Sequence, residues 1–191
     1  YDFNFWAYSR IDTVKPEYLE KLKAAGVNWL ALGIEAGNQE IRREITKGRF
    51  EDINIREVVK MIQDADISVC ANYIFGLGHD DWDTMQETLN LALELNAENH
   101  NMYCATSLPG SPLYLKAKKE GWDLPKEYSE FGFLSYDHIP SRTYNLESKE
   151  VVAFRDYAFH VLFENPRFLN MIHNKFGSKA VDNIKKMTSI K

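Results

Sequence analysis

Polar residues suited to binding or catalysis stand where four apolar, strand-like runs of the chain end. The runs cover residues 3–8, 29–34, 67–75 and 99–105. The polar and glycine positions at or near their ends are Ser9 and Arg10, Glu35, Asn72 with the loop Gly76-Leu77-Gly78, and Thr106 and Ser107. Ligands of parallel α/β folds bind at the carboxyl ends of strands, where loops and helix N-termini converge. We therefore expect these residues to share the mouth of one binding site.

Glu35 is the sharpest of these candidates. It directly continues the apolar run 29–34, and an isolated carboxylate is costly to bury. Its side chain must therefore face the mouth or be paired. A structural salt bridge, with Arg10 as the partner, is the competing interpretation.

Other reactive side chains have structural interpretations. Cys70 and Cys104 are the only cysteines and fall on strand-like runs, where a buried cysteine behaves as a small apolar residue. Two cysteines exclude a disulfide scaffold, and they cannot alone supply a four-thiolate zinc or iron–sulfur site. The five histidines show no metal-ligand spacing, so we predict no metal ligand. Lys47 follows a charged stretch and by itself would be a surface cation.

The elements that must position these residues follow from periodicity. Helical patterns open at Pro16 and close at Gly26, cover 39–46, and recur over 55–62 and 82–93, each between two apolar runs. This alternation predicts a βα series with a parallel sheet, either half of a (β/α) barrel or part of an open sheet. Residues 121–147 are rich in Gly, Pro, Ser and Tyr and predict an extended arm. Helical periodicity returns from Ser148 and breaks near Asn165-Pro166.

Composition sets the broad class. The 191 residues are 45% hydrophobic and 27% charged, which is typical of a globular protein with a sizeable core. A net charge of −5 argues against a general nucleic-acid binder or an anionic-membrane binder. There is no apolar run long enough to span a membrane and no signal peptide, and the cysteine usage fits a reducing cytoplasm. The chain begins at Tyr1 and enters a strand-like run at once, so we expect a piece of a longer protein.

The order of the motifs is more informative than any one of them. They are 8–12 (Tyr-Ser-Arg-Ile-Asp), 25–27 (Ala-Gly-Val), 32–37 (Leu-Gly-Ile-Glu-Ala-Gly) with Lys47-Gly48, 73–78 (Tyr-Ile-Phe-Gly-Leu-Gly) and 108–114 (Leu-Pro-Gly-Ser-Pro-Leu-Tyr). This series resembles the second half of the core of radical SAM enzymes. The branch it is most similar to has a coproporphyrinogen-oxidase-like, Elp3-like and methylthiotransferase-like core, and it includes members with an N-terminal cobalamin-binding domain.

The resemblance implies a fold and a division of the chain. The fold is α/β, the C-terminal part of a partial (β/α)6 TIM-like barrel with parallel strands, followed by an α-helical extension. Residues 1–115 would be the C-terminal half of the core, 116–147 an extended arm, and 148–191 the helical extension.

It also implies cofactors and binding residues. In this family S-adenosylmethionine lies across the barrel, bound to a [4Fe–4S] cluster, and is cleaved to a 5′-deoxyadenosyl radical. Glu35 matches the position that contacts the ribose or the methionine amino end, and Lys47 the residue that pairs with the methionine carboxylate. Ser9 and Arg10 match strand-end positions facing the cofactor, with Arg10 as the alternative carboxylate partner.

The remaining matches lie on the third and fourth strands. Asn72 and Ile74 match the strand edge that lines the adenine, and Thr106 and Ser107 match the rim of the last strand. Gly76, like Gly78, lets the backbone approach the ligand closely.

Two departures from the family pattern limit what this chain can do. Its loop reads Gly76-Leu77-Gly78 where the family usually has Gly-Leu-Pro. The Cys-x3-Cys-x2-Cys loop that binds the cluster and the Gly-Gly-Glu strand end that follows it are absent. We therefore expect these residues to be the C-terminal half of the enzyme, inactive alone and without a catalytic residue of their own.

Other functions stay open. Cobalamin-dependent methyl transfer is a narrower form of the same hypothesis. A fragment of another barrel oxidoreductase or aldolase would use Glu35 as an acid or base and Lys47 as a Schiff-base or phosphate ligand. A non-catalytic βα module would bind an adenosyl ligand or a partner protein. In each case an unpaired strand edge at residues 3–8 invites self-association.

Overall fold

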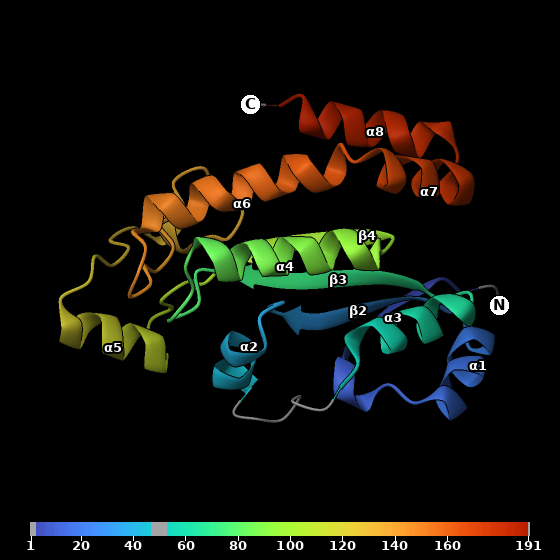
Figure 1. Cartoon of the computed structure of the whole chain (residues 1–191), viewed down its shortest axis with the longest axis horizontal. Coiled ribbons are helices and arrows are strands. Elements are labelled where there is room, and N and C mark those ends of the chain that lie inside the picture. The colour runs from blue at the N-terminus through green and yellow to red at the C-terminus, as the bar shows by residue number, and fades with distance from the viewer. Residues whose placement is uncertain (1–2, 47–52, 191) are drawn as a thin grey trace.

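A parallel four-stranded sheet forms the centre of the molecule (Figure 1). The computed structural model describes residues 3–46 and 53–190. The strands are β1 (Phe5–Arg10), β2 (Val27–Glu35), β3 (Ser68–Phe75) and β4 (Asn99–Cys104), in the order β1-β2-β3-β4. Every neighbouring pair is parallel, so the predicted βα series is confirmed.

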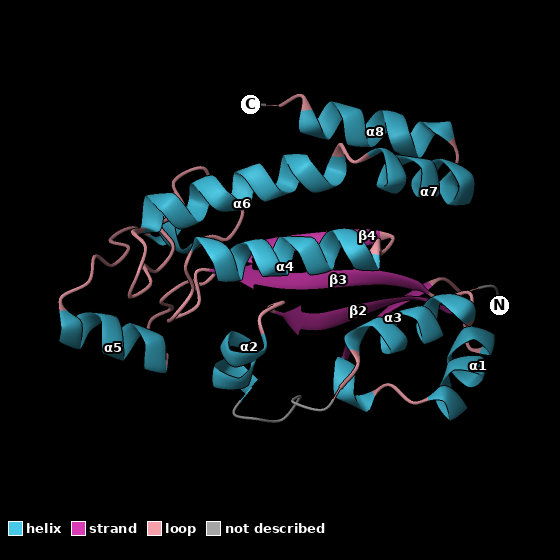
Figure 2. Cartoon of the chain, in the orientation of Figure 1, coloured by secondary structure: helices cyan, strands magenta, loops and turns pink. Residues whose placement is uncertain are grey.

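Helices connect successive strands and cover one face of the sheet (Figure 2). They are α1 (Pro16–Ala24), α2 (Gln39–Thr46), α3 (Ile55–Asp64) and α4 (Trp82–Leu95), with a short 3-10 turn, η1 (Ile11–Thr13), after β1. Local chemistry fixes where they begin. Pro16 occupies the first turn of α1, the Asn54 side chain caps α3, and Asp81 forms a capping box with Thr84 at the start of α4.

The second half of the chain is helical. Its elements are α5 (Pro112–Glu120), the 3-10 turn η2 (Tyr128–Phe131), α6 (Ser148–Phe163), α7 (Pro166–Phe176) and α8 (Ser178–Thr188). The predicted break near Asn165-Pro166 is confirmed, and Gly177 adds a second one. Helix α5 was not expected, because only Ala117 is buried in it and no apolar periodicity marks it. No helix in the described part of the chain is long and apolar enough to cross a bilayer.

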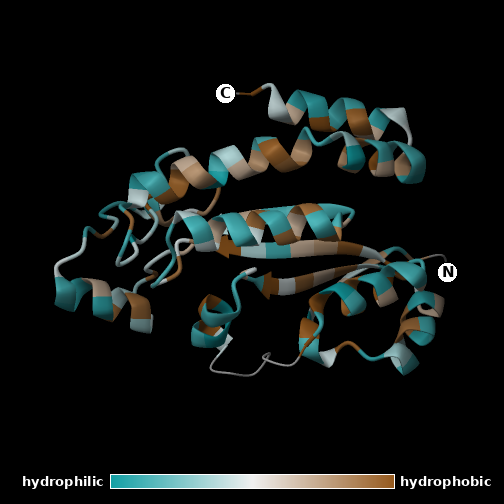
Figure 3. Cartoon of the chain, in the orientation of Figure 1, coloured by the Kyte–Doolittle hydropathy of each residue, from teal (hydrophilic) through white to brown (hydrophobic). Residues whose placement is uncertain are grey.

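Side chains alternate between the two faces of the sheet. One face, the helix face, carries the core, which includes Leu30, Leu32, Val69, Ala71, Tyr73 and Phe75. Strands β2 and β3 include brown, hydrophobic stretches in Figure 3. The other face, which we call the open face, carries Tyr8, Arg10, Asn72, Ile74, Asn101 and Tyr103 according to the strand register. Its polar character is the main departure from a fully covered parallel sheet.

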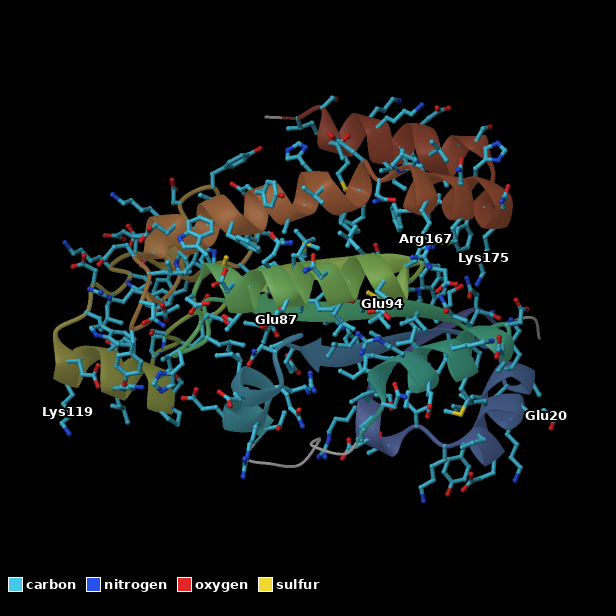
Figure 4. The ribbon with its side chains drawn as sticks, in the orientation of Figure 1. Glu20, Glu87, Glu94, Lys119, Arg167 and Lys175 are labelled. Atoms are coloured by element: carbon cyan, nitrogen blue, oxygen red, sulfur yellow. The ribbon has the colours of Figure 1, made fainter. Side chains whose placement is uncertain are left out.

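Helix α7 is attached to the body by two cations, Arg167 and Lys175 (Figure 4). Arg167 Nη1 donates to the carbonyl of Leu93 at 3.2 Å, close to the end of α4. Lys175 Nζ lies 2.8 Å from Oε1 of the buried Glu98, whose other oxygen accepts from the Val69 amide at 2.8 Å. The C-terminal helices are therefore integrated with the sheet.

The first strand lies two residues later than predicted. It covers Phe5–Arg10, because parallel pairing with β2 continues as far as Arg10 opposite Gly33. Ser9 and Arg10 are therefore part of the strand and do not follow it. Adjacent strand residues point to opposite faces, which decides where each of them can act.

Candidate functional site

One row of the open face brings two of the predicted site positions, Arg10 and Asn72, close together. Arg10 pairs with Gly33, Gly33 with Asn72, and Asn72 with Asn101, so these four residues lie side by side across β1 to β4. Because these residues share a register row, the side chains of Arg10, Asn72 and Asn101 project from the same face. The row lies near the carboxyl ends of the strands, where the sequence predicts the mouth.

The Glu35 carboxylate lies in this row, above Gly33. Glu35 is the last residue of β2 and has a φ of 66°, where the β2–β3 pairing is irregular. A Cβ atom on Gly33 would lie 2.6 Å from Oε1 of Glu35, so the carboxylate occupies the space above the glycine. The side chain is thereby directed between Arg10 and Asn72, and any larger residue at position 33 would displace it.

The Glu35 carboxylate is desolvated. Burial raises the pKa of Glu35, and no residue in the described part of the chain donates a hydrogen bond to it or pairs with it. The Arg10 guanidinium binds Asp12 instead, with Nε 3.0 Å from Oδ1 and Nη2 2.5 Å from Oδ2. The salt bridge considered from the sequence does not form. A desolvated carboxylate at a strand end is suited to accept hydrogen bonds from ligand hydroxyl or ammonium groups.

An amide network fixes Asn72. Its Nδ2 donates to the carbonyl of Leu32 at 3.1 Å, and its Oδ1 accepts from Asn101 Nδ2 at 2.8 Å. The side-chain amides of Asn99 and Asn101 also contact Cys70 Sγ, each at 3.3 Å. Asn99 and Asn101 are functional candidates that the sequence analysis missed. Their signal was the Asn-x-Asn spacing in the fourth strand, which places both on one face.

An apolar wall stands next to the amides. Ile74 and Tyr103 form the next open-face pair toward the mouth, and the Tyr103 ring meets Phe133 edge to face at 5.8 Å between centroids. Phe133 belongs to the segment expected to be an extended arm. Aromatic and aliphatic surfaces of this kind suit a planar ring.

Gly76 lies directly after β3 and has a φ of 77°. A Cβ atom there would lie 2.5 Å from Val151 Cγ1, so α6 and the glycine loop touch. Within the loop, the Leu77 amide donates to Asp80 Oδ2 at 2.9 Å. The backbone at Gly76 is thus fixed in a conformation that glycine adopts without strain.

Other predicted residues are not brought to the row. Ser9 points to the opposite face from Arg10, and its hydroxyl lies 3.0 Å from Thr13 Oγ1. The alternation of β1 thus corrects the expectation that Ser9 and Arg10 face the same ligand.

The hydroxyl groups of Thr106 and Ser107, which follow β4, contact other side chains of this chain. Thr106 Oγ1 lies 2.8 Å from His138 Nε2, and the buried Ser107 hydroxyl lies 2.5 Å from Ser141 Oγ. Lys47 lies outside the described residues, so its predicted role stays a prediction.

Comparisons with known proteins give one family. The family model described as Radical SAM superfamily matches residues 6–92. The anaerobic magnesium-protoporphyrin IX monomethyl ester cyclase of Cereibacter sphaeroides is 27% identical over 131 residues, which are 66% of this chain and 21% of that protein.

Two solved structures share the fold at 20% identity. The radical S-adenosylmethionine methyltransferase TsrM of Kitasatospora setae, with cobalamin and a [4Fe–4S] cluster bound, has a TM-score of 0.53 over 60% of this chain and 23% of its own. Coproporphyrinogen III oxidase (HemN) of Escherichia coli, a radical SAM enzyme, has a TM-score of 0.51 over 64% of this chain and 28% of its own. The chain thus spans less than a third of the length of each relative.

Proposed function

This chain belongs to the radical SAM superfamily, and from that premise we propose that its open face binds the adenosyl part of S-adenosylmethionine. The observation that carries the proposal is the Glu35 carboxylate, desolvated, unpaired in the described part of the chain, and seated over Gly33 in the open-face row. Such a group is costly in the unliganded protein, and a ligand that donates hydrogen bonds to it recovers part of that cost.

Each residue of the site has a role in this proposal. Glu35 accepts hydrogen bonds from the ribose hydroxyls. Asn72, held by Leu32 and Asn101, keeps an acceptor lone pair on Oδ1 for an amino group of the ligand. Ile74 and Tyr103 supply the apolar surface for the adenine ring.

The residues described do not fit an iron–sulfur cluster. Cys70 and Cys104 are 0% and 1% exposed, and the register places them on opposite faces of the sheet. Among the described residues, no three histidine, cysteine, aspartate or glutamate side chains are grouped to hold a metal ion. In our proposal the enzyme of which this chain is a part cleaves S-adenosylmethionine reductively, and the cluster is bound by residues other than these. Methyl transfer with cobalamin is a narrower form of the proposal, supported only by the fold shared with TsrM.

Calorimetric titration with S-adenosylmethionine tests the proposal. We expect Glu35→Gln to weaken binding about tenfold or more, because a hydrogen bond to a charged acceptor is worth about 1.5–3 kcal/mol. Asn72→Ala should weaken it about fivefold through loss of a neutral hydrogen bond. Glu94→Gln is the matched control, since Glu94 lies on α4 and pairs with Arg56 (Figure 4). Absence of binding by the wild-type chain, or equal affinities for wild type and Glu35→Gln, would overturn it.

A further inference from the structure

Three consecutive residues of the C-terminal half hold the loop that follows β3. We call Thr143, Tyr144 and Asn145 the strap. Thr143 Oγ1 donates to the carbonyl of Asp80 at 2.8 Å, and the Tyr144 amide donates to the carbonyl of Gly78 at 2.9 Å. Asn145 Nδ2 donates to the carbonyl of His79 at 3.0 Å. The strap thereby satisfies three carbonyls of a loop that directly continues the site strand.

Thr143 is the centre of this contact. It is fully buried, and its hydroxyl also accepts from the amides of Asn145 at 3.0 Å and Leu146 at 2.8 Å. One hydroxyl therefore connects the loop to the turn that leads into α6. Removing it leaves the buried Asp80 carbonyl and the buried Leu146 amide without that partner, which is more costly than losing an exposed hydrogen bond.

The loop is also held from within. Asp80 is 2% exposed, and its carboxylate accepts from the Leu77 amide at 2.9 Å and from Thr84 Oγ1 at 2.7 Å. The Asp80 amide in turn donates to the carbonyl of Leu77 at 2.7 Å. The loop after Gly76 is therefore held by hydrogen bonds to Asp80, which belongs to the loop itself, and by hydrogen bonds from the strap, which belongs to the C-terminal half of the chain.

We propose that Thr143 and Asn145 are positioning residues for the adenosyl site, and that the strap couples ligand binding to the C-terminal helices. The inference rests on the proposed function of the open face. The strap orders the loop from Gly76 to Asp80, and α6 closes on Gly76 through Val151. Ligand binding at the loop and docking of α6 therefore stabilise each other, as linkage between two sites requires.

Amide hydrogen exchange tests the positioning role without any ligand. Thr143→Val keeps the shape of the side chain and removes the hydroxyl, whereas Thr143→Ser keeps the hydroxyl. We expect the Leu77 and Asp80 amides to exchange about five- to tenfold faster in Thr143→Val, the factor for one buried hydrogen bond, and to return close to the wild-type rate in Thr143→Ser. If Thr143→Val fails to fold, Asn145→Asp takes its place. Its side chain cannot donate to the His79 carbonyl, so we expect the same local effect. Asn54→Ala, which removes the cap of α3, is the control for general destabilisation.

Titration of the same variants with S-adenosylmethionine tests the coupling. We expect Thr143→Val to bind five- to tenfold more weakly, with Thr143→Ser and Asn54→Ala unchanged. Faster loop exchange with unchanged affinity would overturn the coupling, and a uniform rise in exchange along the whole chain would overturn the positioning role. If wild type binds no ligand, the proposed function fails, whereas the exchange result still decides whether the strap orders the loop.

Discussion

Glu35 combines two properties that each cost stability. Its carboxylate is desolvated, and its backbone lies in the left-handed region, where residues other than glycine are strained. Both features cost stability in the free protein. Sites that bind charged or polar ligands often carry such costs, because the groups that receive the ligand are unsatisfied before it arrives.

Glu35→Gln should therefore stabilise the free chain while weakening the site. Because burial raises the pKa of Glu35, the folded state holds its proton to higher pH than the unfolded state does. Stability from this group is complete below the ordinary value of 4.5 and is lost as pH rises through the folded pKa. Urea unfolding should show the variant more stable at pH 7 and equal to wild type at pH 3.5, within about 0.5 kcal/mol. A variant that is less stable at pH 7 contradicts this account of Glu35.

His100 gives the opposite dependence on pH. It is 3% exposed, it stacks on Tyr73 at 5.9 Å between centroids, and burial lowers its pKa to about 3. The unfolded chain binds a proton near pH 6.5, so the free energy of unfolding should fall as pH drops from 6.5 toward 3. Each pKa unit of difference is worth about 1.4 kcal/mol. His100→Leu should remove this slope in urea denaturation series, and an unchanged slope would assign the acid sensitivity to other groups.

At the scale of elements, the glycine loop after β3 packs directly against α6. Gly76 has a positive φ and no space for a Cβ, since Val151 Cγ1 would be 2.5 Å away. Gly110 also has a positive φ, of 83°, but nothing lies within 4 Å of its Cβ position. An alanine at Gly110 would therefore introduce backbone strain alone, whereas an alanine at Gly76 would introduce backbone strain and a steric clash.

Gly76→Ala should cost about 2–4 kcal/mol of unfolding free energy, and Gly110→Ala about 1 kcal/mol. The difference comes from the clash with Val151. In a double-mutant cycle, Val151→Ala should lessen the additional cost of Gly76→Ala, because it removes the clashing methyl groups. Equal losses for the two glycine variants, or strict additivity with Val151→Ala, would mean that α6 does not press on the loop.

At the scale of the whole molecule, the sheet has an outer strand with exposed aromatic side chains. β1 pairs only with β2 in the described sheet, and Tyr8 on its open face is 85% exposed. Exposed strand edges promote association. If the chain self-associates through this edge, sedimentation velocity should show a dimer or larger species. The protein concentration should be tens of micromolar, a rough working range for weak contacts. Tyr8→Lys should shift this species to monomer, whereas Tyr128→Lys, at an exposed tyrosine of η2, should not. A wild-type monomer at all concentrations would contradict the prediction.

Most of the fold could be predicted from the sequence, because strong periodicity and local caps determine it. The predicted run 29–34 lies within β2, and the helix over 39–46 and the break at Asn165-Pro166 are found as predicted. Helix α5 could not be predicted from the sequence, because it has no apolar face. It is bounded instead by the caps at Ser111 and Gly121.

The site was harder to predict than the fold. Glu35 and Asn72 could be proposed from the sequence because they follow or interrupt apolar runs. The separation of Ser9 from Arg10 depends on the exact register of β1, and the roles of Asn99, Asn101 and Thr143 depend on contacts between residues distant in sequence. Such contacts leave no local pattern.

The most direct test of the central claim is an amide-resolved NMR titration of this chain with S-adenosylmethionine. If the open face binds the adenosyl group, saturable shifts should appear at Asn72, Ile74, Gly76 and Asn101 and in the side-chain amides of Asn72 and Asn101, and Glu35→Gln should reduce them at equal ligand concentration. Saturable shifts confined to the helix face, or none at millimolar ligand, a concentration that detects binding as weak as about −4 kcal/mol, would contradict the claim.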